Sequence, residues 1–320
     1  MNDFLRIPLG QWVENFIDFV TSTFGFLFDF IKLIISSVAD GMSFAFASPP
    51  FWVMLIIFAA LAFVARGWLF SLGTTLGFLL ILSLDQWENA MDTLALVLVA
   101  AAIAVLISVP LGILAAKYRT VSTIVKPILD FLQTMPAFVY LIPALILFRI
   151  GDVPGIVATV LFALAPGVRL TELGIRGVDH EVVEAGQAFG ASPGRILRQI
   201  QLPLALPSIM AGINQVIMLS LSMVVIAAMV GAGGLGGPVI QSLSRADVAL
   251  GFEAGLSVVI LAIFLDRLTA SFGSGKGYFR FILDSFNFRA RRSESDATES
   301  TTADSGAASA EPAELTPPVR

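Results

Sequence analysis

Few side chains in this sequence could carry out covalent or acid–base chemistry. The 320 residues include no cysteine and a single histidine, so thiol chemistry is excluded and a histidine base has one candidate, His180. His180 and Glu184 stand four residues apart on a predicted helix, which brings both side chains to one face. No second pair of metal-ligating residues lies near them. We therefore interpret them as a surface pair and expect neither a catalytic residue nor a metal site.

A glycine-rich stretch near the end, SFGSGKGYF at residues 271–279, has part of a phosphate-binding pattern. A Walker A loop needs a glycine five residues before Gly275 and a serine or threonine after Lys276. Ala270 and Gly277 occupy these positions. We therefore expect the chain itself to bind no ATP and no other cofactor.

The elements that would hold any functional site are predicted to be membrane helices. Hydrophobic residues make up 57% of the chain and charged residues 13%, whereas soluble domains average about 25% charged residues. The run Thr93–Ala116 contains no charge and exceeds the roughly 20 apolar residues that cross a bilayer. The composition thus predicts an all-α polytopic membrane protein with about seven transmembrane helices. We expect them at residues 51–65, 68–84, 93–116, 128–149, 154–170, 208–230 and 250–270.

The two ends of the chain differ from this central part. Residues 11–38 repeat phenylalanine at helical spacing but include Asp29 and Lys32, each of which would cost about 2.5–3.5 kcal/mol at a helix centre. We therefore predict an amphipathic helix in the membrane interface rather than a span, and no cleavable signal peptide. The last residues are acidic and rich in Ser, Thr, Ala and Pro, which is typical of disorder. The predicted division is 1–50 (extracytoplasmic segment), 51–275 (membrane domain, core about 88–270) and 276–320 (acidic cytoplasmic tail).

Basic residues indicate how the spans are oriented. They gather in alternate connections, whereas the stretches Leu84–Asp92 and Gly151–Pro154 on the opposite side are acidic. Because basic loops stay on the cytoplasmic side, we expect a multi-pass membrane protein with its N-terminus outside and its C-terminus inside. The predicted cytoplasmic basic residues are Arg66, Lys117, Arg119, Lys126, Arg169, Arg176, Arg195 and Arg198.

The longest predicted cytoplasmic connection, residues 173–207, is polar and punctuated by glycine. A short helical pattern ends at Gly190, and Ser192-Pro193 is a typical start for a second short helix, which we expect to end at Leu202-Pro203. Two short amphipathic helices joined by glycine would suit docking to a soluble partner. A solvated loop between spans fits the same pattern, so both interpretations stay open.

The residues of this connection resemble the EAA motif of ABC-importer permeases. Glu184-Ala185, Gly190, Ile200 and Leu202-Pro203 match it in type and spacing, and Gly186 departs from the usual alanine. The resemblance covers most of residues 5–270 and is specific for the permease subunits of glycine betaine/proline-type importers, the binding-protein-dependent transport system inner-membrane components. The matching stretches include IPLGQWVENF near the start, Ile128–Phe148, Val153–Val178 and Leu206–Gly236.

This resemblance implies a type I ABC importer permease that carries glycine betaine or a similar compatible solute for osmoprotection. It implies a second copy of the permease, cytoplasmic ABC ATPase subunits that bind the ATP, and a separate extracytoplasmic solute-binding protein. It also implies no partner nucleic acid and no enzymatic activity in this chain. The ATPase-coupling residues carried over from the motif and its surroundings are Glu184, Ala185, Gly186, Phe189, Gly190, Ile200, Leu202 and Pro203.

Candidates for the substrate pathway are aromatic or amide side chains within the predicted spans. Aromatic faces attract a quaternary ammonium group by about 0.5–2 kcal/mol each, and amides could face a polar pathway. The candidates are Phe131, Phe138, Tyr140, Asn214 and Gln215. The same aromatics could instead face lipid or the core, and the amides could bridge helices. An ion-gradient-driven transporter of a small zwitterion is the alternative function, for which Glu253 is the best-placed carboxylate.

Overall fold

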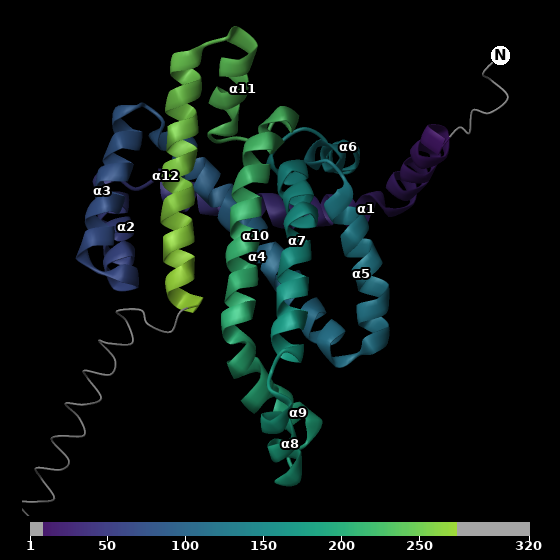
Figure 1. The fold of residues 1–320 in the computed structure, drawn as a ribbon. Coiled ribbons are helices and arrows are strands. Elements are labelled where there is room, and N and C mark those ends of the chain that lie inside the picture. Colours follow the sequence, from purple (N-terminus) through teal and green to yellow (C-terminus); the bar gives the residue numbers. More distant parts are fainter. Residues whose placement is uncertain (1–8, 274–320) are drawn as a thin grey trace, which may run out of the picture.

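The computed structural model describes residues 9–273, and this part of the chain contains helices and connecting turns but no strand (Figure 1). The part of the glycine-rich stretch 271–279 that follows Gly273 and the acidic tail lie outside the described residues. The helices are α1 (Leu9–Ala47), α2 (Phe51–Arg66), α3 (Trp68–Ser83), α4 (Trp87–Lys117), α5 (Arg119–Thr134), α6 (Ala137–Phe148), α7 (Asp152–Arg176), α8 (His180–Ala188), α9 (Pro193–Ile196), α10 (Leu202–Ala227), α11 (Gly236–Arg245) and α12 (Val248–Gly273).

Three long helices, α4, α7 and α10, form the centre of the molecule. α7 packs against both of the others along most of its length. Small residues permit this close approach, as is usual between membrane helices. A Cβ atom added to Gly112 of α4 would lie 2.6 Å from Cβ of Thr171 in α7, and one added to Gly174 of α7 would lie 2.7 Å from Cβ of Ser208 in α10. Larger side chains at these glycines would push the helices apart.

Most predicted spans are confirmed as apolar helices, although their ends differ. The spans 93–116, 154–170 and 250–270 correspond to α4, α7 and α12, each of which is longer than predicted. Within the described range, five helices are long and apolar enough to cross a membrane, or six if one bent pair counts as a span. α2 and α3 occupy the predicted positions but have 16 residues each, fewer than the roughly 20 that cross a bilayer squarely.

The predicted span 128–149 lies in a bent pair of helices rather than in one straight helix. α5 ends at Thr134, α6 begins at Ala137, and the two helices meet at 102°. Met135 is extended, with ψ of 135°, because the ring of Pro136 disfavours helical geometry in the residue before it.

The N-terminal helix α1 is longer than the predicted 11–38 and has a non-helical residue at Phe24. It runs across the long central helices rather than alongside them (Figure 1). Phe28 of α1 packs edge-on against Phe148 of α6, with ring centroids 5.7 Å apart, and Ala39 is buried in the core. The residues Gly10–Ala47 are also long and apolar enough to span a membrane, so the interfacial location stays a prediction.

A glycine-rich turn after α10 connects the central helices at the end opposite α8. The backbone N–H of Leu235 donates to Thr93 Oγ1 of α4 at 2.7 Å, and that of Gly233 donates to Asp152 Oδ1 of α7 at 2.8 Å. Gly234 has a φ of +85° and lies directly on Thr93, which leaves no room for a side chain. This turn therefore fixes the ends of α4, α7 and α10 relative to one another.

Candidate functional site

The α8–α9 loop, residues 177–201, projects beyond the other helices at one end of the bundle (Figure 1). Asp179 caps α8 by accepting the backbone N–H of Glu181 at 3.0 Å. Glu184, Ala185 and Phe189 are exposed, and the exposed fraction of Phe189 reaches 93%. The ring of Phe189 therefore lies almost wholly outside the core.

The end of α8 is a Schellman motif, which confirms the predicted helix stop at Gly190. The N–H of Gly190 donates to the carbonyl of Gln187 at 2.8 Å, and the N–H of Ala191 donates to that of Gly186 at 3.1 Å. Gly190 has a φ of +75°, a conformation that costs other residues about 1–2 kcal/mol. The two hydrogen bonds hold the backbone on either side of Phe189 and Gly190 in one conformation.

The glycine at position 186 allows the two halves of the loop to pack closely. A Cβ atom there would lie 2.7 Å from Cδ1 of Ile200, and Ile196 is also near. Ile196 is buried, and Ile200 is half-buried. A glycine in α8 lowers helix stability by about 0.5–1 kcal/mol, but here it makes room for the Ile200 side chain.

The second half of the loop does not end at Leu202-Pro203, as predicted from the proline. Residues Pro193–Val230 form one apolar helical unit, in which Leu197–Gln201 is a π-helical turn leading into α10. A wider π turn places the preceding carbonyls differently, which lets Pro203 continue the helix without the usual clash. The second half of the loop is therefore a continuous extension of α10, the helix that packs along α7.

A cluster of charged residues at the base of this loop was not predicted. Glu172 is only 6% exposed, and its Oε1 accepts from Ser122 Oγ at 2.8 Å, with Lys126 Nζ at 3.4 Å and Arg176 Nε at 3.2 Å. Arg176 also donates to the carbonyl of Ala115 at 2.8 Å. The spacing of Glu172 and Arg176 is visible in the sequence, but the contact with α5 joins residues 50 positions apart.

The aromatic pathway candidates divide into exposed and buried residues. Phe131 of α5 and Phe138 of α6 are exposed by 64% and 52%. Tyr140 is 3% exposed, and its hydroxyl donates to the carbonyl of Leu132 across the bend between α5 and α6. Tyr140 therefore stabilises the bend, whereas the two phenylalanines lie on an open surface.

The two amide candidates also differ in their surroundings. Asn214 Nδ2 donates to Asp266 Oδ1 at 2.9 Å, and Asn214 Oδ1 accepts from Thr269, so this side chain bridges α10 and α12. Gln215 is the next residue along α10, and its side chain is exposed.

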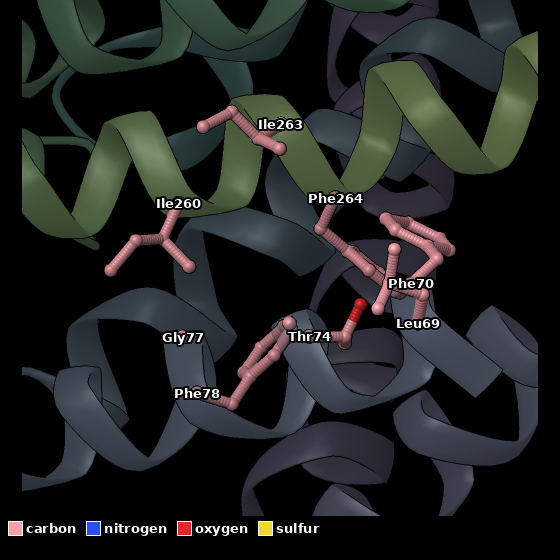
Figure 2. Close-up of a pocket in the computed structure, with 9 residues that line it drawn as sticks. Leu69, Phe70, Thr74, Gly77, Phe78, Ile260, Ile263 and Phe264 are labelled. Atoms are coloured by element: carbon pink, nitrogen blue, oxygen red, sulfur yellow. The ribbon is translucent and has the colours of Figure 1, made fainter.

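A cavity of about 220 Å³ between α3 and α12 contains none of these candidates. Figure 2 shows its lining, which is apolar except for Thr74 and includes Phe70 and Phe264. The Thr74 hydroxyl is buried and has no hydrogen-bond partner. No charged side chain lines this cavity, so it lacks a counterion for the carboxylate of a zwitterion.

The single histidine lies on the loop surface. His180 Nδ1 is 3.1 Å from Glu184 Oε1, and both side chains are mostly exposed. Within residues 9–273 no group of three possible metal ligands gathers. The pair thus has the geometry of an i, i+4 contact on α8.

Comparison with known proteins shows the family to which the chain belongs. A family model described as "Binding-protein-dependent transport system inner membrane component" matches residues 108–275. The chain is 48% identical over 264 residues to the glycine betaine transport system permease protein OpuAB of Bacillus subtilis, covering 82% of this chain and 94% of that protein. It is 49% identical over 270 residues to the glycine betaine/carnitine transport permease protein GbuB of Listeria monocytogenes, covering 83% and 95%.

Two further comparisons extend this likeness. The glycine betaine/proline betaine transport system permease protein ProW of Escherichia coli is 45% identical over 267 residues, covering 83% of this chain and 75% of that protein. A solved structure of inward-facing conformations of the MetNI methionine ABC transporter superposes with a TM-score of 0.51 at 25% identity, covering 57% of this chain and 91% of that chain.

Proposed function

The chain belongs to the family of inner-membrane components of binding-protein-dependent transport systems and has the type I ABC importer permease fold, and from this premise we propose that it imports glycine betaine or a closely similar compatible solute. The main support is that relatives 45–49% identical over most of the chain carry glycine betaine in their names. The chain is a transport subunit and not itself an enzyme.

Coupling to ATP hydrolysis is proposed for the α8–α9 loop. The projecting position and the exposed Phe189 support a seat in a cytoplasmic ABC ATPase subunit, which would bind the ATP. Because the second half of the loop continues into α10, a displacement of the loop acts directly on a central helix. The proposed coupling residues are Glu184, Ala185, Gly186, Phe189, Gly190, Ile200, Leu202 and Pro203.

The proposed pathway lies between two copies of this chain. The exposed rings of Phe131 and Phe138 and the exposed amide of Gln215 are the candidates that a second copy could enclose. Aromatic faces suit the quaternary ammonium of a betaine. Asn214 and Tyr140 would not contact the solute. They would affect the pathway by holding together the helices that they connect.

The proposed orientation places the α8–α9 loop and the C-terminus in the cytoplasm, and the N-terminal segment 1–50 outside. Lys117, Arg176 and Arg195 lie at the loop end of the bundle, whereas Asp85 and Asp152 lie at the ends of helices on the other side. This asymmetry supports cytoplasmic placement of the loop. A solute-binding protein would deliver the solute to the opposite, extracytoplasmic end.

Reconstitution tests the proposed function. The chain is placed in liposomes with its ATPase subunit, with ATP inside and with labelled glycine betaine and the solute-binding protein outside. We expect uptake that requires ATP and is abolished by vanadate or by an ATPase variant that binds ATP without hydrolysing it. Uptake that follows an imposed ion gradient and persists without the ATPase would indicate an ion-driven transporter instead.

A further inference from the structure

Glu172 is the only buried carboxylate among the side chains that the structure describes, and the proposed transport cycle does not yet use it. A buried carboxylate is costly unless it is paired. Here the Ser122 hydroxyl, the Lys126 ammonium and the Arg176 guanidinium all approach the same oxygen, Oε1, at 2.8, 3.4 and 3.2 Å. Two of these groups come from α5 and one from α7, so Glu172 joins the two helices.

The cluster lies at the point where α7 passes into the α8–α9 loop. Arg176 is the last residue of α7, and Asp179, which caps α8, follows three residues later. Arg176 also donates to the carbonyl of Ala115 in the last turn of α4. A movement of the loop therefore reaches Arg176 and Glu172 before it reaches any other contact between α7 and α5.

Besides Glu172, α5 is held by contacts with α4, which directly precedes it in the chain, and with α7. Its apolar contact with α7 is a small cluster around Leu129, Ala165 and Val168, and its second ion pair, Asp130 with Arg169, is exposed. Exposed ion pairs stabilise a contact only weakly. At its other end α5 turns through the 102° bend into α6, the region that holds Phe131 and Phe138.

Building on the proposed function, we propose that Glu172 is a positioning residue that makes α5 follow the α8–α9 loop. When the ATPase displaces the loop, the Glu172 contacts with Ser122 and Lys126 carry that displacement into α5 and hence into the bend of the pathway wall. Without the carboxylate charge, the loop and α10 still move, but α5 lags behind. ATP is then hydrolysed without a matching movement of solute.

The test measures the number of ATP molecules hydrolysed per solute imported in the reconstituted complex. We expect Glu172→Gln to raise this ratio by about fivefold or more, because a coupling between two sites is typically of that size or larger. Lys126→Met, which removes the α5 partner of the same ion pair, should also raise the number of ATP molecules hydrolysed per solute. The double variant should be no worse than Glu172→Gln alone, because both changes break one link. Glu14→Gln, the same chemical change at an exposed position of α1, is the matched control and should leave the ratio unchanged.

The number of ATP molecules hydrolysed per solute distinguishes a role of Glu172 in coupling from a role in stability alone. If Glu172 only stabilises the fold, its loss lowers hydrolysis and uptake in proportion, and an unchanged ratio would overturn the proposal. Should Glu172→Gln fail to accumulate in the membrane, Lys126→Met, whose side chain is half exposed, decides by the same criterion. Failure of the proposed function is visible independently, as a wild-type complex whose uptake does not require ATP.

Discussion

Gly190 has a backbone conformation that favours glycine, and it lies on the surface of the proposed coupling loop. It closes the Schellman motif with a φ of +75°, and no atom lies within 4 Å of where its Cβ would be. A side chain there would strain the turn by about 1–2 kcal/mol and would project onto the surface proposed to meet the ATPase. We expect Gly190→Asp to abolish uptake while the permease still reaches the membrane, as measured by transport and immunoblot.

Gly190→Asn separates strain from charge at the same position. Asparagine tolerates the left-handed conformation better than most residues and adds no charge. Partial activity in this variant would attribute the loss in Gly190→Asp mainly to charge at the interface. Normal uptake with aspartate would contradict the coupling role of the loop.

The neighbours Asn214 and Gln215 allow a second comparison between single residues. Asn214 is bonded to Asp266 and Thr269 of α12, so Asn214→Ala should destabilise the protein by about 1–3 kcal/mol with little change in the KM for solute. Gln215 is exposed, so Gln215→Ala should leave the melting temperature unchanged and raise KM if a second copy encloses the pathway there. If Gln215→Ala lowered stability and left KM unchanged, Gln215 would not line the pathway.

At the scale of elements, the bend between α5 and α6 depends on Tyr140. Its hydroxyl satisfies the Leu132 carbonyl, which the broken helix would otherwise leave without a partner. We expect Tyr140→Phe to cost about 1–3 kcal/mol of stability and to lower the maximal uptake rate without changing KM. Thermal unfolding and uptake kinetics measure the two effects. Phe138→Leu, on the exposed side of the same helix, is the control for stability, and a KM change in Tyr140→Phe would instead indicate contact with solute.

Elements differ in how well the sequence predicted them, for identifiable reasons. α4, α7 and α12 were predicted because long apolar runs are unambiguous. The helix that continues through Pro203 was wrongly predicted to end there, since a proline breaks or continues a helix according to the turn before it. The motif residues of the α8–α9 loop were found by their spacing, whereas the contact of Glu172 with Ser122 depends on how α5 packs against α7.

For the whole molecule, the orientation in the membrane is a prediction that this chain is well suited to test. Because it contains no cysteine, a single introduced thiol reports on one position alone. Phe189 is 93% exposed on the α8–α9 loop, and Val248 is 85% exposed at the start of α12 on the opposite side. Both sites accept a cysteine without disturbing the core.

We expect a membrane-impermeant maleimide to label Val248→Cys in intact cells and to label Phe189→Cys only after the membrane is opened. The chain is produced without its ATPase, so that a bound partner does not protect residue 189, and the cysteine-free protein controls for background. The expectation follows from the basic residues at the loop end, which stay on the cytoplasmic side. Labelling of Phe189→Cys in intact cells would show that the orientation is the reverse of the predicted one. The proposed coupling loop would then lie outside the cell, where no ATPase subunit could bind it.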